Sequence, residues 1–141
     1  MMKNEKHLKN LLTGKGGIDS LQLEKIFAKC RNDKEKMRKL VRAFCTAYLI
    51  DNKQRPLRMR PMQEDIVLEC LTNRDDGKQK KLAILAPRGS GKSFALSVAV
   101  TIYMFFNRFR DLVFILAPTE DQAALIFNYV YRHFADNTFL N

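Results

Sequence analysis

The sequence predicts an α/β protein in which a small parallel sheet follows an all-helical, basic N-terminal segment. Two apolar runs of strand length, "KLAILA" (residues 81–86) and "LVFILAP" (residues 112–118), alternate with two long helical patterns in the second half. This alternation is typical of parallel sheets, because a crossover helix must carry the chain back before the next parallel strand begins. We therefore expect two parts, a helical segment over residues 1–57 and the first part of an α/β domain over residues 58–141.

Apolar residues at spacings of three and four predict the helices of the first part. Residues 1–17 are expected to hold a short helix and a glycine-containing joint, and Asp19 offers an N-cap to the next helix. A further helix is expected over residues 34–50, and Pro61 fits the first turn of another, "PMQEDIVLECL". The buried stripe of the helix over residues 34–50 is predicted to be Met37, Leu40, Val41, Phe44, Cys45 and Tyr48.

Two more helices are expected around the second predicted strand. "KSFALSVAVTIYMFFN" is apolar nearly all round, which favours a helix that is buried on several sides. "TEDQAALIFNYVYRHF" is amphipathic, and Thr119 is a suitable N-cap for it. Together with the two apolar runs, these helices complete the predicted βαβ order.

The chain carries a formal net charge of +10, and all of the excess lies in the first part. Residues 1–60 contain 16 Lys and Arg against 6 Asp and Glu, whereas residues 61–141 contain 9 of each class. Such a segment attracts polyanions, nucleic acid first and an anionic membrane second. The alternative is that these charges only form a solvated helical surface. Much of the charge falls on one predicted helix, at Lys34, Lys36, Arg38, Lys39 and Arg42.

Cysteine spacing and hydropathy indicate the compartment. The three cysteines are widely spaced and include no C-x-x-C pair, which argues against a zinc site and against a disulfide framework. The longest uncharged run has 15 residues, fewer than the roughly 20 that span a bilayer. We therefore expect a soluble protein of a reducing, cytoplasmic compartment, without membrane contact.

The glycine loop "APRGSGKS" (residues 86–93) ends like a phosphate-binding loop. Ala86 stands where the usual pattern G-x-x-x-x-G-K-[ST] has its first glycine. Gly89 and Gly91 permit the positive φ values that bring backbone N–H groups close to a phosphate. Lys92 can reach the β- and γ-phosphates, and the hydroxyl of Ser93 can bind Mg²⁺. The alternative is a basic turn without a ligand.

This loop resembles the Walker A motif of large terminase subunits, the ATP-driven DNA-packaging motors of tailed phages and related viruses. "RPMQ" (residues 60–63) is similar to their adenine-recognition motif, and "VFILAPTEDQA" (residues 113–123) to their second strand and the motif after it. The resemblance covers residues 58–125 and implies a RecA-like P-loop NTPase fold that binds ATP and Mg²⁺. It also implies double-stranded DNA, a small terminase subunit and a portal protein as partners, a homo-oligomeric ring for the full-length protein, and the host cell cytoplasm.

The same resemblance assigns roles to the matching positions. Gln63 would hydrogen-bond the adenine edge and Arg60 would frame the base, although Met62 stands where an aromatic residue is frequent. Arg88 would sense or stabilise the γ-phosphate, and with Lys92 it forms the predicted catalytic pair. The predicted nucleotide-binding set is Arg60, Gln63, Pro87, Arg88, Gly89, Ser90, Gly91, Lys92 and Ser93, with Ser93 as the metal ligand.

Efficient hydrolysis requires a Walker B element, and the sequence shows none. Glu120 lies past the second apolar run and is interpreted as a charge of the first helical turn rather than as a catalyst, and no carboxylate cluster for a nuclease is present. We therefore expect the N-terminal, ATP-binding piece of a longer terminase, which binds ATP with little or no turnover. The alternatives are a fragment of a helicase-like translocase, a non-enzymatic basic DNA-binding adaptor and, less favoured, a small-molecule kinase.

Overall fold

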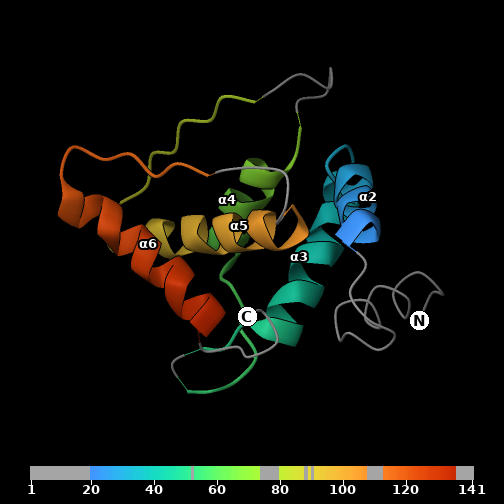
Figure 1. Cartoon of the computed structure of the whole chain (residues 1–141), viewed down its shortest axis with the longest axis horizontal. Helices are drawn as coiled ribbons and strands as arrows, with labels where there is room; N and C mark the ends of the chain where they lie inside the picture. Colours follow the sequence, from blue (N-terminus) through green and yellow to red (C-terminus); the bar gives the residue numbers. More distant parts are fainter. Residues whose placement is uncertain are drawn as a thin grey trace.

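The computed structural model describes residues 20–51, 53–73, 80–87, 89, 91–107 and 113–135. Within these residues it forms five helices, namely α2 (Ser20–Cys30), α3 (Lys34–Tyr48), α4 (Pro61–Leu71), α5 (Lys92–Phe106) and α6 (Glu120–Ala135). Figure 1 shows α5 in the middle of the molecule, with α4 and α6 against it and α2 near its C-terminal end. The helix expected within residues 1–17 and the N-cap expected at Asp19 lie outside the described residues.

The starts of α3, α4 and α6 agree with the sequence predictions, whereas α3 ends at Tyr48, two residues before its predicted end at residue 50. Asp33 caps α3 by accepting two backbone hydrogen bonds on its carboxylate, and Pro61 is the first residue of α4. Thr119 accepts a hydrogen bond on Oγ1 from the backbone N–H of Gln122 at 3.3 Å, as expected of an N-cap. All of the positions predicted for the apolar stripe of α3 are buried.

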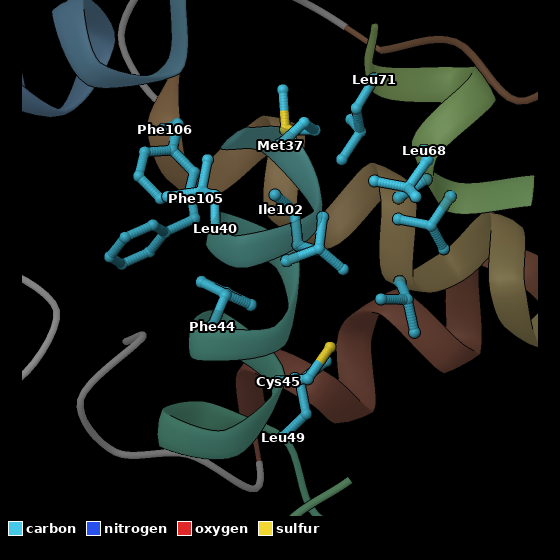
Figure 2. Close-up of a cluster of buried hydrophobic side chains, with 14 of the residues drawn as sticks. Met37, Leu40, Phe44, Cys45, Leu49, Leu68, Leu71, Ile102, Phe105 and Phe106 are labelled. Atoms are coloured by element: carbon cyan, nitrogen blue, oxygen red, sulfur yellow. The ribbon is translucent and has the colours of Figure 1, made fainter. Parts of the chain in front are cut away.

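The core gathers around α5, which is buried on several sides as its apolar sequence predicts (Figure 2). The ring of Phe106 stacks on Phe27 of α2 with centroids 5.6 Å apart, and Phe105 meets Phe44 of α3 edge-on at 5.2 Å. Each such aromatic pair adds about 0.5–1.5 kcal/mol beyond the burial of apolar area. One cluster of buried side chains therefore spans residue 57, where the sequence analysis placed a boundary.

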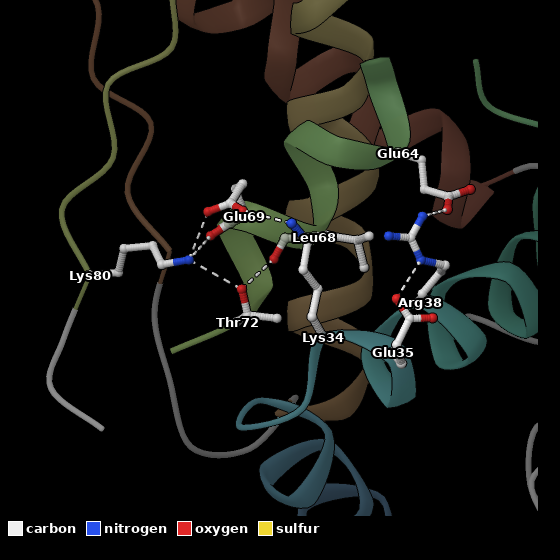
Figure 3. A network of polar contacts seen from close by, with 8 residues as sticks. All are labelled: Lys34, Glu35, Arg38, Glu64, Leu68, Glu69, Thr72 and Lys80. Carbon is white, nitrogen blue, oxygen red and sulfur yellow. Dashed lines mark hydrogen bonds and ion pairs between the residues drawn. The ribbon is translucent and has the colours of Figure 1, made fainter. Parts of the chain in front are cut away.

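The predicted parallel sheet is absent from the described residues, so the α/β fold class, with its RecA-like P-loop NTPase sheet, is wrong for this structure. Residues 80–87 and 113–118 run as irregular segments along the same side of the molecule (Figures 1 and 3), and the β-bridge between Ile50 and Pro56 is isolated. Leu85, Phe114 and Leu116 are 101%, 78% and 91% exposed. A strand forms only when its backbone pairs with a neighbour, and an apolar run favours pairing without supplying the partner.

The segment that leads to the glycine loop is tied to the last turn of α4 by an ionic network (Figure 3). Nζ of Lys80 donates to the carboxylate of Glu69 at 3.0 Å and to Oγ1 of Thr72 at 3.1 Å. Lys34 of α3 donates to the same carboxylate at 3.1 Å. These hydrogen bonds, that of Lys80 first, hold the pKa of Glu69 below its usual value.

We predict that Glu69→Gln makes the unfolding free energy less dependent on pH in the acid range. Because the folded-state pKa of Glu69 is lowered, its contribution is complete above the ordinary carboxyl pKa of about 4.3 and is lost as the pH falls through the lowered value. The carboxylate is 42% exposed, so about 0.5–1 kcal/mol should separate the two proteins at neutral pH.

Urea unfolding at several pH values between 7 and 3 measures this difference. The matched control is Asp65→Asn, which removes an exposed carboxylate from the same helix and leaves the hydrogen bonds of Lys80 in place. A gap between wild type and Glu69→Gln that persists undiminished at pH 3 contradicts the prediction.

Candidate functional site

The glycine loop leads directly into α5. Gly89 and Gly91 have φ values of 76° and 82°, so the expected positive φ is confirmed at both glycines. Gly91 is the N-cap of α5, and its carbonyl accepts a hydrogen bond from the N–H of Ala95 at 3.0 Å. These are left-handed conformations that a residue with a Cβ adopts only under strain.

Lys92 is the first residue of α5, and its side chain turns back over the loop. Its Nζ donates a hydrogen bond to the carbonyl of Ala86 at 3.2 Å, so the ammonium group reaches from the end of the loop to its beginning. Ser93 follows in the first turn and is half-buried. Because Gly91 has no side chain to cap the helix, the first N–H groups of α5 present the positive end of the helix dipole to this region.

Two residues from the start of α4 lie against the same loop. A Cβ atom placed on Gly91 would collide with Nε2 of Gln63 and would lie 3.0 Å from a terminal nitrogen of Arg60. Gln63 is buried, and its Oε1 accepts a hydrogen bond from the backbone N–H of Arg60 at 3.1 Å. The fold therefore brings Arg60 and Gln63 next to Gly91, although the sequence separates them by most of α4 and by the segment before the loop.

The remaining predicted site residues are less informative. Pro87 is exposed at the end of the segment that precedes the loop, and Met62 is 38% exposed in the first turn of α4. Arg88 and Ser90 lie outside the described residues, so their predicted roles stay predictions.

Sequence reasoning missed Glu64, the residue after Gln63. Its side chain is 10% exposed and lies between two arginines of α3. Arg38 donates to one carboxylate oxygen at 3.0 Å, and Arg42 donates to both oxygens at 2.9 and 3.1 Å. The position of Glu64 on its helix could have revealed this contact, because Glu64 lies on the same helical face as the buried Leu68 and Leu71. A carboxylate on a buried face requires a cation beside it.

These ion pairs reduce the basic surface that the sequence predicted on α3. Lys34, Arg38 and Arg42 are paired with acids of α4. Lys36 and Lys39 are exposed, and no ion pair holds them within the part of the chain that the structure describes.

The cysteines and carboxylates of the described residues do not assemble a metal site. Cys30, Cys45 and Cys70 are free, and burial raises the pKa of the Cys45 thiol to about 12. Among the described residues, no group of three or more His, Cys, Asp and Glu side chains could hold a metal ion. None of the helices in this part of the chain is both long and apolar enough to cross a membrane.

Comparisons with protein-family models, with curated proteins and with solved structures found no match to this chain. The terminase resemblance therefore rests on three short motifs of the sequence. The structure describes residues 60–63 of the first motif completely and the glycine loop apart from Arg88 and Ser90.

We predict that Gly91→Ala destabilises the protein more than Gly89→Ala. Both glycines have a positive φ, so both variants should lose about 1–2 kcal/mol to backbone strain. A Cβ at Gly89 meets no described atom within 4 Å, whereas a Cβ at Gly91 meets Gln63 and Arg60. Gly89→Ala is therefore the matched control for backbone strain alone. Thermal or urea unfolding measures the loss of stability in each variant.

A double-mutant cycle with Gln63→Ala isolates the contact. If Gln63 lies over Gly91, truncating it should relieve part of the cost of Gly91→Ala, with a coupling of about 1 kcal/mol or more. Strictly additive effects of Gly91→Ala and Gln63→Ala would show that the two residues do not touch in solution.

Proposed function

We propose that this chain binds ATP with Mg²⁺ and is the ATP-binding portion of a viral DNA-packaging motor of the terminase type. The observation that carries the proposal is the contact of Gln63 and Arg60 with Gly91. The side-chain amide of a glutamine can donate and accept hydrogen bonds at once, which suits the adenine edge. A glycine turn without a ligand does not require an amide and a guanidinium group beside it.

Three features of the loop suit the phosphates of the nucleotide. Gly89 and Gly91 hold the backbone in the left-handed conformation that allows close approach of N–H groups to an anion. The uncapped N-terminus of α5 adds further donors and a favourable dipole. Lys92 would exchange its hydrogen bond to the Ala86 carbonyl for phosphate oxygens, because charge-assisted bonds between two ions are stronger.

The proposed Mg²⁺ ligand is the hydroxyl of Ser93 in the first turn of α5. The ion would neutralise charge on the β- and γ-phosphates. Nucleotide binding by this arrangement depends on α4, α5 and the loop, and does not depend on pairing between the exposed segments 80–87 and 113–118. Arg88 remains the candidate for the γ-phosphate.

Assignment to a packaging motor rests on the order of the three motifs and on the basic first part of the chain. In such a motor, ATP hydrolysis drives the translocation of double-stranded DNA. The proposed partners are the DNA, the small terminase subunit, the portal protein and further copies of the same subunit in a ring. This chain has no recognisable Walker B element, so we propose binding with little or no turnover.

We predict that ATP with Mg²⁺ raises the melting temperature of the wild type and that Lys92→Ala abolishes most of this shift. Each charge-assisted bond lost with the ammonium group is worth about 1.5–3 kcal/mol, and ligand binding stabilises the folded state by mass action. The matched control is Lys81→Ala, which removes an exposed lysine from the segment before the loop. Equal shifts for wild type and Lys92→Ala would exclude the phosphate role of this lysine.

We also predict that duplex DNA binds to the exposed lysines of α3 and that its affinity falls steeply with salt. Lys36→Glu with Lys39→Glu should reduce the slope of log affinity against log salt by about 2, because each phosphate contact contributes about 0.9. Arg42 must be left intact in this variant, since it pairs with Glu64. Fluorescence anisotropy over a salt series measures the slope, and an unchanged slope means that α3 is a solvated surface.

A further inference from the structure

Glu64 is an acidic group held almost completely out of water by α3. Its side chain is 10% exposed, and it accepts hydrogen bonds from Arg38 at 3.0 Å and from Arg42 at 2.9 and 3.1 Å (Figure 3 shows the contact with Arg38). Removing a carboxylate from water is costly unless cations and donors surround it. The position of Glu64 is therefore set by the two guanidinium groups.

Gln63 is the neighbour of Glu64 in the first turn of α4. When the backbone moves at Glu64, it therefore also moves at Gln63. The amide of Gln63 is held on one side by the N–H of Arg60 and faces Gly91 on the other. Neither contact fixes the start of α4 relative to α3. The bidentate grip of Arg42 on Glu64 does so, because a planar guanidinium group restrains both the distance and the orientation of a carboxylate.

We propose that Arg42 and Arg38 are positioning residues that act through Glu64 to hold Gln63 against the glycine loop, and so set the preference for adenine over guanine. This inference rests on the proposed nucleotide-binding function and deepens it. The two arginines belong to α3, which contributes no residue to the loop. α3 would therefore position a binding residue within the molecule, in addition to any contact that it makes with DNA.

A purely structural role for these arginines makes a different prediction. Lys34 and Glu69 form a second ion pair between α3 and α4 at 3.1 Å, and it lies at the other end of α4, far along the helix from Gln63. Lys34 and Arg42 are comparably exposed, at 49% and 63%. If both pairs merely fasten α3 to α4, then removing either cation should have the same effect on nucleotide binding.

The experiment measures dissociation constants for ATP and GTP, each with Mg²⁺, by isothermal titration calorimetry on wild type, Arg42→Gln and Lys34→Gln. We expect Arg42→Gln to reduce the preference for ATP about three- to tenfold, the equivalent of one hydrogen bond, with little change in GTP affinity. Lys34→Gln should leave the ratio unchanged. Arg42→Lys keeps the charge but not the bidentate grip, so it should give an intermediate ratio.

The Gln63→Ala background tests whether the effect passes through Gln63. There, Arg42→Gln should produce no further change in the ratio of ATP to GTP affinity, because the residue that it positions has been removed. Thermal unfolding of each variant without nucleotide confirms that it is folded at the temperature of the titration.

The outcomes separate this inference from the function on which it rests. A wild type that binds neither nucleotide, or both equally, overturns the proposed adenine site and the positioning role together. A wild type that prefers ATP, with a ratio that Arg42→Gln leaves intact or that Lys34→Gln lowers equally, overturns only the positioning role. Additive effects of Arg42→Gln and Gln63→Ala on the ratio also overturn it.

Discussion

The apolar surface of α5 is the constraint from which the rest of the structure follows. The two polar residues buried on this helix, Ser97 and Thr101, satisfy their hydroxyls within it, with bonds to backbone carbonyls at 2.6 and 2.7 Å. A helix of this kind is stable in water only when neighbouring elements cover it on several sides. α2, α3, α4 and α6 provide that cover. The glycine loop therefore enters the most enclosed helix of the fold, and the core fixes the direction in which its N-terminus points.

α4 connects this core to the loop and to the basic helix, because its faces make different contacts. Its apolar residues pack towards α5, and its glutamates form ion pairs with cations of α3. The start of the helix places Gln63 and Arg60 against Gly91. Its last turn also binds Lys80, which begins the segment before the loop. A single short helix thus contacts the glycine loop at one end and anchors the chain that approaches it at the other.

The exposed segments 80–87 and 113–118 show where the local sequence no longer suffices to predict the structure. Residues 81–86 form an apolar run of strand length, and residues 113–117 carry the β-branched and aromatic side chains typical of buried strands. Neither segment forms a strand in the described residues, and Leu85 and Leu116 face solvent. Helices complete their hydrogen bonds within one segment, so periodicity suffices to predict them. Strands need a second backbone, and the predicted sheet was wrong because no segment of the described chain occupies that position.

The sequence alone determined the five described helices, the buried stripe of α3 and the positive φ of Gly89 and Gly91, because these depend on local spacing and on residues without a Cβ. It also indicated a phosphate loop and an upstream glutamine as separate motifs. Only the tertiary structure decided that Gln63 lies on Gly91 and that Glu64 lies between Arg38 and Arg42. The physical reason is that such contacts join residues far apart in the chain, and their geometry is set by how α3, α4 and α5 pack together, which no local pattern encodes.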